Sequence, residues 1–482
     1  MTKLLRRATL GALGLVLCAA AQAPVPAPAP SPVPAPSHSP VPAPSPSPVP
    51  APFPAPVPAP SPAPVPAPSH SPVPVQAGAK DAAFSQIDGI VAELWEISGL
   101  KPLAKVKYER ISRDRLKLFL DRRIEREVKP EEIQAQEAVL KKFGFAPADF
   151  DLKRTTIELL AEQAAAFYDF HKKKLFLVQG DSGADDKLPL VHELAHALAD
   201  QHFHLGKFLD SVRENDDSSL ARLSVMEGQA TWLMSEYEVR QTGRSLRNSP
   251  ELAKSMSAIN GASSGQFPIF DRAPRYLQET LLFPYTEGLL FQQAVVEKMG
   301  TAAFTAVFRD PPVSTQQILH PQKYLAHARP VRPPLPEFPS ERHYRVFTDG
   351  EMGELDHAIL LRQYAGEHES AALAPEWRGG CFRLFKRKGQ PADWRQMVLA
   401  YASEWTGPEP ARRYFELYQK VLARKWKTFE VTSRSADWVA GRGDDGYFVV
   451  RIAGARVSSL EGLASAGEGL PAAPPLAETR LH

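Results

Sequence analysis

The most informative segment of the chain reads Leu188-Pro-Leu-Val-His192-Glu193-Leu-Ala-His196-Ala-Leu-Ala-Asp200. It contains two histidines four residues apart, with a glutamate directly after the first one. Residues four apart lie about 40° apart around a helix axis, so both imidazoles point the same way and can share one metal ion. The other residues are mostly apolar and predict a buried helix, in which imidazole and carboxylate groups are costly unless they have partners.

This spacing predicts a zinc site with hydrolytic chemistry. Zinc accepts nitrogen and oxygen ligands, and its catalytic sites keep one coordination position open for water. Glu193 lies about 100° around the helix from His192, next to the metal-binding face, where it can take a proton from that water. We therefore expect one zinc ion per chain and peptide-bond hydrolysis by a zinc-bound water that Glu193 activates.

Two residues are candidates for the third zinc ligand. His202 follows His192 by ten residues, the spacing of the metzincin pattern, but that pattern has a turn-forming glycine where this chain has Ala199. If the helix continues past Ala199, His202 lies about 15 Å from His192 along the axis and cannot share its metal. The other candidate, Glu227, lies in a second predicted helix, where small residues just after it would let this helix pack closely on the first one. Glu227 is the favoured candidate, because it completes a His₂Glu site with an open fourth position.

A resemblance to the gluzincin branch of zinc metallopeptidases, in particular to its exported bacterial members, rests on two segments, Val191-His-Glu-Leu-Ala-His-Ala-Leu-Ala-Asp-Gln-His202 and Met226-Glu-Gly-Gln-Ala230. Further similar segments are Phe167-Tyr-Asp169, Phe283-Pro-Tyr-Thr-Glu-Gly288 and Ser314-Thr-Gln-Gln-Ile-Leu-His-Pro321. The resemblance covers about residues 80–330. It implies a zincin-like fold, in which residues 175–178 would form the edge strand that aligns an extended peptide substrate. It also implies that His192, His196 and Glu227 bind the metal and that Glu193 is the base.

Peptide hydrolysis also needs a donor for the developing oxyanion, usually a histidine or tyrosine from the far side of the cleft. The candidates are His320, in Gln317-Ile-Leu-His-Pro321, and Tyr285, in a predicted Pro-Tyr-Thr-Glu-Gly turn. For both, the alternative is an ordinary structural role. Asp200, one turn after His196, is placed either to orient a ligand imidazole or to remain a carboxylate on the helix surface.

The N-terminus predicts export. Three basic residues precede a short apolar run at 10–17, and small residues follow it, so a signal peptide is expected at 1–21. The apolar run is too short to span a membrane. The alternative is a lipoprotein signal with lipidation at Cys18. Both interpretations place the protein in the periplasm, in the cell envelope or outside the cell.

A proline-rich segment follows the predicted signal peptide, since residues 24–74 contain 24 of the 47 prolines. Alternating proline restricts φ and removes N–H donors, so residues 22–78 are predicted to form a polyproline II stalk. Such a stalk suits tethering to a cell wall or a membrane. The net charge of +2 and the absence of long basic runs argue against nucleic-acid binding. The expected partner is instead a protein or peptide substrate.

The expected fold class is α+β, with a zincin-like, mostly helical metallopeptidase domain at 80–330 that contains a small mixed sheet. Apolar spacing predicts helices at 84–97, 114–126, 131–143 and 157–165, a strand at 106–111 and a hairpin at 166–178. A proline-rich bridge predicts a boundary near residue 340. A C-terminal α+β module is expected at 340–462, with helices at 355–364 and 408–426 and strands at 381–385, 397–401, 428–432 and 447–452. Residues 463–482 are expected to be a disordered tail.

Two other functions compete with a peptidase. The first is a catalytically inactive zincin-like binding or scaffold protein of the cell envelope, which the long stalk would suit. The second is a di-iron carboxylate protein, because Glu193-x-x-His196 and Glu354-x-x-His357 both have the Glu-x-x-His spacing of four-helix di-iron sites. The proline-rich bridge between the two motifs argues against such a bundle.

Overall fold

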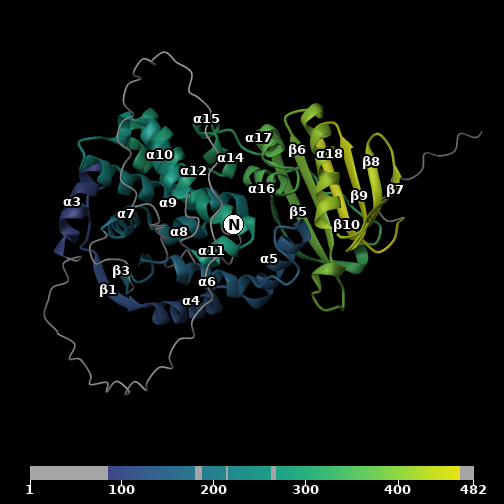
Figure 1. The fold of residues 1–482 in the computed structure, drawn as a ribbon, viewed down its shortest axis with the longest axis horizontal. Helices are drawn as coiled ribbons and strands as arrows, with labels where there is room; N and C mark the ends of the chain where they lie inside the picture. The colour runs from purple at the N-terminus through teal and green to yellow at the C-terminus, as the bar shows by residue number, and fades with distance from the viewer. Residues whose placement is uncertain (1–84, 180–186, 213–214, 262–266, 467–482) are drawn as a thin grey trace, which may run out of the picture. The chain divides into compact units, whose positions relative to one another are not determined.

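The structure is a computed structural model that describes residues 85–179, 187–212, 215–261 and 267–466. The predicted signal peptide, the alternative lipidation site, the predicted stalk and most of the predicted tail lie outside these ranges. The described residues form a mixed α+β protein, with helices and a small sheet in the first part of the chain and a larger sheet in the second part (Figure 1). Its α+β class is therefore as expected.

Thirteen α-helices are described before residue 330. They are α3 (Ile87–Ser98), α4 (Arg113–Glu127), α5 (Pro130–Phe143), α6 (Leu152–Gln163), α7 (Leu188–Phe203), α8 (Leu205–Asp210), α9 (Asp216–Arg240), α10 (Pro250–Gly261), α11 (Pro268–Arg272), α12 (Arg275–Met299), α13 (Ala303–Arg309), α14 (Thr315–Leu319) and α15 (Pro321–Leu325). Short 3-10 helices lie at Leu246–Asn248, Gly300–Ala302, Glu341–His343, Ala374–Glu376 and Trp394–Gln396.

Local sequence signals explain where several of these helices begin and end. Gly99 ends α3 in the left-handed conformation, at φ 75°, as its position after the last apolar residue predicts. The Asp151 side chain accepts a hydrogen bond from the Arg154 N–H and so begins α6 earlier than the apolar spacing alone indicates. The four helices expected at 84–165 are confirmed, with boundaries shifted by a few residues.

The small sheet contains β1 (Lys107–Ser112), β2 (Ala166–Asp169) and β3 (Lys174–Gln179), in the order β1-β3-β2. β2 and β3 form the expected antiparallel hairpin, and β1 pairs with β3 in parallel, so the sheet is mixed. The expectation that residues 175–178 form an edge strand is wrong. Strand β3 lies in the middle, because β1 pairs with the side of β3 that β2 leaves open. The edge strand that packs against α7 is β2.

The second part of the chain is built on a seven-stranded antiparallel sheet. Its strand order is β4-β5-β6-β10-β9-β8-β7, with bounds Tyr344–Glu351, Trp377–Arg387, Val398–Trp405, Arg456–Leu463, Gly446–Ala453, Trp438–Gly443 and Phe429–Arg434. Helices α16 (Glu354–Tyr364), α17 (Glu367–Leu373) and α18 (Pro408–Lys425) accompany it. The four strands and two helices expected here are present, and β4, β8 and β10 were not expected.

The two long helices α9 and α12 form the largest helix pair of the first part. Gly228 and Gly288 allow this pairing, because a β-carbon on Gly228 would lie 2.3 Å from the carbonyl carbon of Gly288. Helix α9 packs against α7 as expected, but Gly228 contacts α12, so the part given to this glycine in the packing on α7 is wrong. Neighbouring helical residues differ by about 100° in direction, so Gly228 faces α12 while Glu227 faces α7.

Helix α12 passes through Pro284 without ending. The turn predicted at Tyr285 is therefore wrong. Proline removes one backbone donor and usually breaks a helix. Here, buried residues on both sides of Pro284, from Tyr276 to Val296, pack α12 into the core, and this packing outweighs the local preference.

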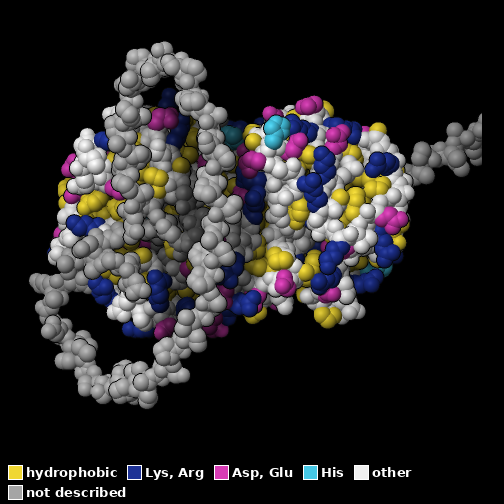
Figure 2. All heavy atoms as spheres, viewed as in Figure 1, with side chains coloured by type: hydrophobic (Ala, Val, Ile, Leu, Met, Phe, Trp, Pro, Cys, Tyr) yellow, Lys and Arg dark blue, Asp and Glu magenta, His cyan; other side chains and the backbone are white. Residues whose placement is uncertain are grey.

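Charged side chains of both signs are interspersed on the described part of the face that Figure 2 shows. This distribution agrees with the formal net charge of +2. Within the described residues, none of the helices combines the length and the apolar character that a membrane span requires.

Candidate metal centre

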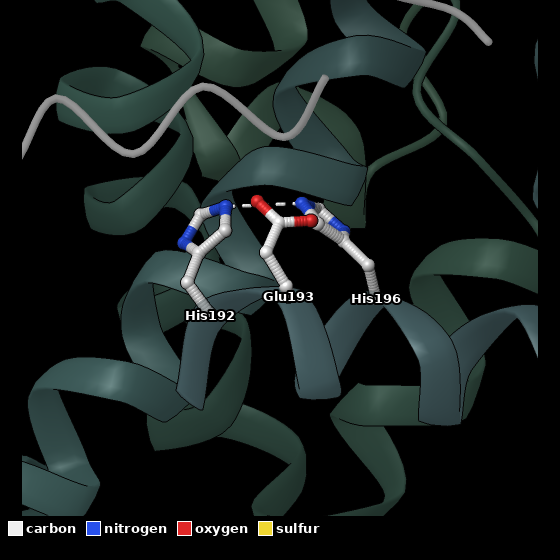
Figure 3. A group of neighbouring side chains, drawn as sticks. All are labelled: His192, Glu193 and His196. Carbon is white, nitrogen blue, oxygen red and sulfur yellow. Dashed lines mark hydrogen bonds between the residues drawn. The ribbon is translucent and has the colours of Figure 1, made fainter. Parts of the chain in front are cut away.

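Helix α7 presents His192, Glu193 and His196 toward one side (Figure 3). The helix has Pro189 in its first turn, a favoured position because the missing N–H has no helical partner there. It ends where His204 adopts a left-handed conformation, at φ 51°. The central residues of α7 are all buried, so the helix holds its imidazoles and its carboxylate away from solvent.

Helix α9 brings Glu227 to the two histidines. The Nε2 atoms of His192 and His196 lie 3.0 Å apart, and Glu227 Oε2 lies 3.1 Å from the first and 3.2 Å from the second. These three atoms form an almost equilateral triangle. His192, His196 and Glu227 are called the metal triad. The three side chains are at most 1% exposed.

Protons alone pair the metal triad in a crowded way. Protons on the two Nε2 atoms can both point to Glu227 Oε2, but the two N–H groups then lie side by side on nitrogen atoms only 3.0 Å apart. Protons on the Nδ1 atoms of His192 and His196 would have no acceptor, because both Nδ1 atoms are buried without a hydrogen-bond partner in the described structure. A cation at the triangle would relieve the crowding, because it accepts all three lone pairs at once, and the imidazoles would then carry their protons on Nδ1.

The donor set and its spacing fit zinc. Ligand atoms around a tetrahedral zinc ion at ~2.1 Å lie roughly 3.4 Å from one another, a few tenths of an ångström more than the separations in the triad. Burial lowers the pKa of His192 to about 4, so this imidazole is neutral at pH 7, the form that binds metal. Burial opposes ionisation of Glu227, but the two imidazoles outweigh this effect and hold the pKa of Glu227 below its ordinary value. Glu227 would therefore offer a metal ion an anionic oxygen.

Glu193 lies just outside the triad. Its carboxylate, His192 and His196 can each offer a ligand atom within 4.8 Å of the others, a looser grouping than that of Glu227 with the histidines. Glu193 Oε2 accepts a hydrogen bond of 2.7 Å from the backbone N–H of Tyr168 in β2, whereas Oε1 is buried without a partner. Burial and the Glu227 charge raise the pKa of Glu193 well above its ordinary range, and the Tyr168 N–H opposes this shift.

Tyr168 and Lys173 are site neighbours to which the sequence interpretation assigned no role. The Tyr168 hydroxyl donates to Asp200 Oδ2 over 3.2 Å, Lys173 pairs with the same oxygen, and the Leu205 N–H donates to Asp200 Oδ1 over 2.9 Å. Asp200 thus ties the β2–β3 hairpin to the end of α7, and it does not orient an imidazole. One sequence signal could have pointed to these contacts. An aromatic strand lies directly upstream of the helix, and the helix carries a carboxylate one turn after His196.

His202, the alternative third ligand, lies outside the metal centre. Its Nε2 is 2.7 Å from the carbonyl oxygen of Lys101, and α7 continues to Phe203 without the turn that a third histidine would need. The structure therefore brings Glu227, and not His202, to His192 and His196.

The two candidate oxyanion donors lie in different places. The Tyr285 ring is buried beside His192, with ring centroids 6.1 Å apart. His320 Nε2 lies 2.7 Å from Glu354 Oε1, and among its other neighbours is Glu287 on α12. Tyr285 is therefore at the metal centre, while His320 belongs to a separate polar cluster.

The second Glu-x-x-His motif does not complete a di-iron site. Glu354 accepts one hydrogen bond from Gln316 and contacts His320. His357 Nδ1 donates to the Gly353 carbonyl over 2.8 Å, and its Nε2 accepts from the Tyr401 hydroxyl over 2.6 Å. Both ring nitrogens of His357 are therefore occupied by protein groups, and the di-iron alternative is wrong.

Comparisons with protein-family models, with curated proteins and with solved structures found no match to this chain.

Proposed function

We propose that this protein is an exported, zinc-dependent peptidase with a zincin-like catalytic domain. The observation that carries the proposal is the triad of His192 Nε2, His196 Nε2 and Glu227 Oε2, at 3.0–3.2 Å from one another, with the carboxylate of Glu193 beside it. Three ligands from two helices and one adjacent carboxylate are the minimum set for metal-assisted hydrolysis.

Zinc at the triad would supply Lewis-acid activation of water and of a peptide carbonyl. The chain's own residues divide the remaining work. The Tyr168 N–H holds and orients Glu193 Oε2. The positive charge of a bound zinc would favour the ionised carboxylate against the effect of burial, so that Oε1 could accept a proton from water and return it to the leaving amine. Tyr285, beside His192, is the better placed donor for the oxyanion.

The peptide substrate class follows from the proposed zincin-like arrangement of a strand beside the zinc-binding helix. In this chain that strand is β2, at the edge of the small sheet. In a regular antiparallel ladder, the N–H and C=O groups of alternate residues point to the outer side of an edge strand. The Tyr168 N–H, which points to Glu193, has this direction.

A specific observation also supports a second function, a catalytically inactive scaffold in which the metal is structural. His192, Glu193, His196 and Glu227 are all at most 1% exposed, so in the described structure the site is shielded from solvent and from a substrate. In that case zinc would serve mainly to join α7 to α9. The two functions make the same prediction for metal content and opposite predictions for hydrolysis.

The first experiment is elemental analysis of the purified protein beside two variants. Wild-type protein is expected to bind about one zinc per chain, and Glu227→Ala should lose most of it. His202→Ala is the matched control, since His202 contacts the Lys101 carbonyl instead of the triad, and it should keep the metal. Wild-type protein that is folded but free of metal under zinc-replete conditions would contradict both functions. Hydrolysis of an unstructured protein substrate by the zinc-loaded wild type then separates the peptidase from the scaffold.

A further inference from the structure

Buried hydroxyl groups continue along α9 from the metal triad. Thr231 and Ser235 follow Glu227 by one and two helical turns, so the three side chains lie along one side of the helix. Thr231 is 2% exposed and Ser235 is 0% exposed. Neither hydroxyl has a hydrogen-bond partner in the described structure. Polar atoms therefore extend from the metal site into the protein interior without protein partners.

Other buried hydroxyl groups on the same two long helices are satisfied. Ser224 in α9 donates to the carbonyl four residues earlier over 2.8 Å, and Thr280 in α12 does the same over 2.7 Å. This local bond is the ordinary solution for a hydroxyl inside a helix. Thr231 and Ser235 do not use it, so their hydroxyl groups still have hydrogen-bonding capacity to offer a ligand group or an ordered water.

Helix α12 places a buried amide opposite these hydroxyl groups. Gly288 contacts Gly228 of α9, and one turn later Gln293 Oε1 accepts a hydrogen bond of 2.7 Å from Trp232 Nε1. The two helices therefore run side by side in the same direction. From helical periodicity we infer that Gln292, one turn after Gly288, lies on the side of α12 toward α9, at about the level of Thr231. Gln292 is 0% exposed, and neither its amide oxygen nor its amide nitrogen has a partner.

The neutral polar strip, defined as Thr231, Ser235 and Gln292, contains no charged group. The nearest carboxylate beyond it on α9, that of Glu236, is already bound by Arg240, Ser245 and the Leu246 N–H. A charged ligand group in the strip would therefore be buried without a counter-charge, and an apolar group would leave the strip atoms unpaired. A carboxamide fits both limits, because it is neutral and both donates and accepts hydrogen bonds.

We propose that the neutral polar strip is a specificity subsite that binds the side-chain carboxamide of a glutamine or asparagine next to the scissile bond. This inference rests on the proposed peptidase function. Thr231 lies about 6 Å from Glu227 along α9, a distance that a long side chain covers from a backbone held at the triad. Gln292 pairs with the ligand amide, and Thr231 supplies a further hydrogen bond.

Three amino-acid hydroxamates test the subsite by binding alone. L-glutamine, L-norleucine and L-glutamate α-hydroxamates share a zinc-binding group and differ at the end of the side chain, which is an amide, an alkyl group or a carboxylate. Isothermal titration calorimetry on the zinc-loaded full-length protein should show at least tenfold tighter binding of the glutamine compound than of the other two.

Two variants test whether the preference for the glutamine compound depends on the strip. Gln292→Met removes the amide at nearly constant shape and should abolish the preference for glutamine over norleucine. Gln229→Met is the matched control, because Gln229 is an equally buried amide without partners on roughly the opposite side of α9 from Thr231, and it should leave the preference unchanged. Melting temperatures of both variants show whether the fold is retained, and Thr231→Val provides a second strip variant if Gln292→Met does not fold.

The outcomes separate this inference from the function on which it rests. Equal affinities for the three hydroxamates would overturn the subsite but leave the zinc site intact, and ordered water would then be the partner of the strip. A loss of preference in Gln229→Met equal to that in Gln292→Met would also overturn it. If the protein binds no zinc, or if none of the hydroxamates binds the zinc-loaded protein, the proposed function and the subsite both fail.

Discussion

Gly228 of α9 and Gly288 of α12 meet backbone to backbone, one residue after Glu227, the proposed third metal ligand. A β-carbon on Gly228 would lie 2.3 Å from the carbonyl carbon of Gly288, and one on Gly288 would lie 2.5 Å from the Ser224 carbonyl oxygen. Neither obstacle is a flexible side chain that can move aside. The closeness of the two helices therefore sets the position of α9, and with it the position of the Glu227 carboxylate against His192.

Gly228→Ala should destabilise the protein and weaken metal binding. The added methyl group forces α9 and α12 apart, which costs about 1–3 kcal/mol of unfolding free energy and moves Glu227 relative to the histidines. Chemical denaturation and zinc content measure the two effects. Gly206→Ala in α8 is the control, because a β-carbon there meets nothing within 4 Å, and it should be neutral or slightly stabilising. Equal behaviour of the two variants would contradict the role given to the helix contact.

Glu193→Gln should separate metal binding from catalysis. The glutamine keeps the size of the side chain and retains an oxygen for the Tyr168 N–H, but it cannot accept the proton from water. Peptidase activity should fall by at least 10²-fold, while zinc content and melting temperature stay close to those of the wild type. Full activity in a zinc-loaded Glu193→Gln protein would show that Glu193 is not the base.

Asp217, in the first turn of α9, should make the stability of the protein depend on pH. Its Oδ1 accepts hydrogen bonds from the Thr315 N–H and hydroxyl, but burial raises the pKa of Asp217 to about 7 from an ordinary value of 3.8. The neutral carboxyl is therefore favoured in the fold. The contribution of Asp217 to the unfolding free energy falls as pH rises from about 4 to about 7 and stays low above that, with a total of about 4 kcal/mol at most.

Asp217→Asn should remove this pH dependence, because the amide keeps Oδ1 and carries no charge. Urea denaturation at pH 5 and at pH 8 should show the variant gaining stability over the wild type mainly at pH 8. A constant difference between the two proteins across this range would contradict the raised pKa of Asp217. Asp216→Asn, one residue earlier and only half-buried, is the control.

Removing one partner of the buried ion pair of Lys142 and Asp445 should lower the unfolding free energy more than replacing both partners. Lys142 Nζ in α5 lies 3.0 Å from Asp445 Oδ2 in the β8–β9 turn, and the two side chains are 0% and 5% exposed. Burial lowers the pKa of Lys142, and Asp445 opposes this shift. Asp445→Ala should cost about 3 kcal/mol of unfolding free energy, because it leaves the ammonium group without its carboxylate partner. Adding Lys142→Met to that variant should recover at least half of the loss in a denaturation experiment.

Much of the fold could be predicted where local patterns are strong. The helices between 84 and 165 and the hairpin before α7 followed from apolar spacing and from glycine punctuation, because these signals act within one or two turns of the chain. Strands β4, β8 and β10 could not be predicted in the same way. Strand β8 contains two glycines where Glu430 and Trp426 approach its backbone, and its pairing depends on strands distant in sequence.

Part of the candidate metal centre could likewise be predicted from local sequence, and part of it could not. The four-residue spacing of His192 and His196, with Glu193 between them, determines their common direction on any helix, so the amino-acid order alone was enough to predict this part. The choice of Glu227 over His202 depended on whether α7 turns or continues, and only the packed structure shows that it continues. The same holds for the Tyr168 N–H on Glu193 and for the contact of Gly228 with Gly288. Each of these relationships joins residues from separate elements, whose positions are set by burial and helix packing over long sequence distances and not by the identity of neighbours along the chain.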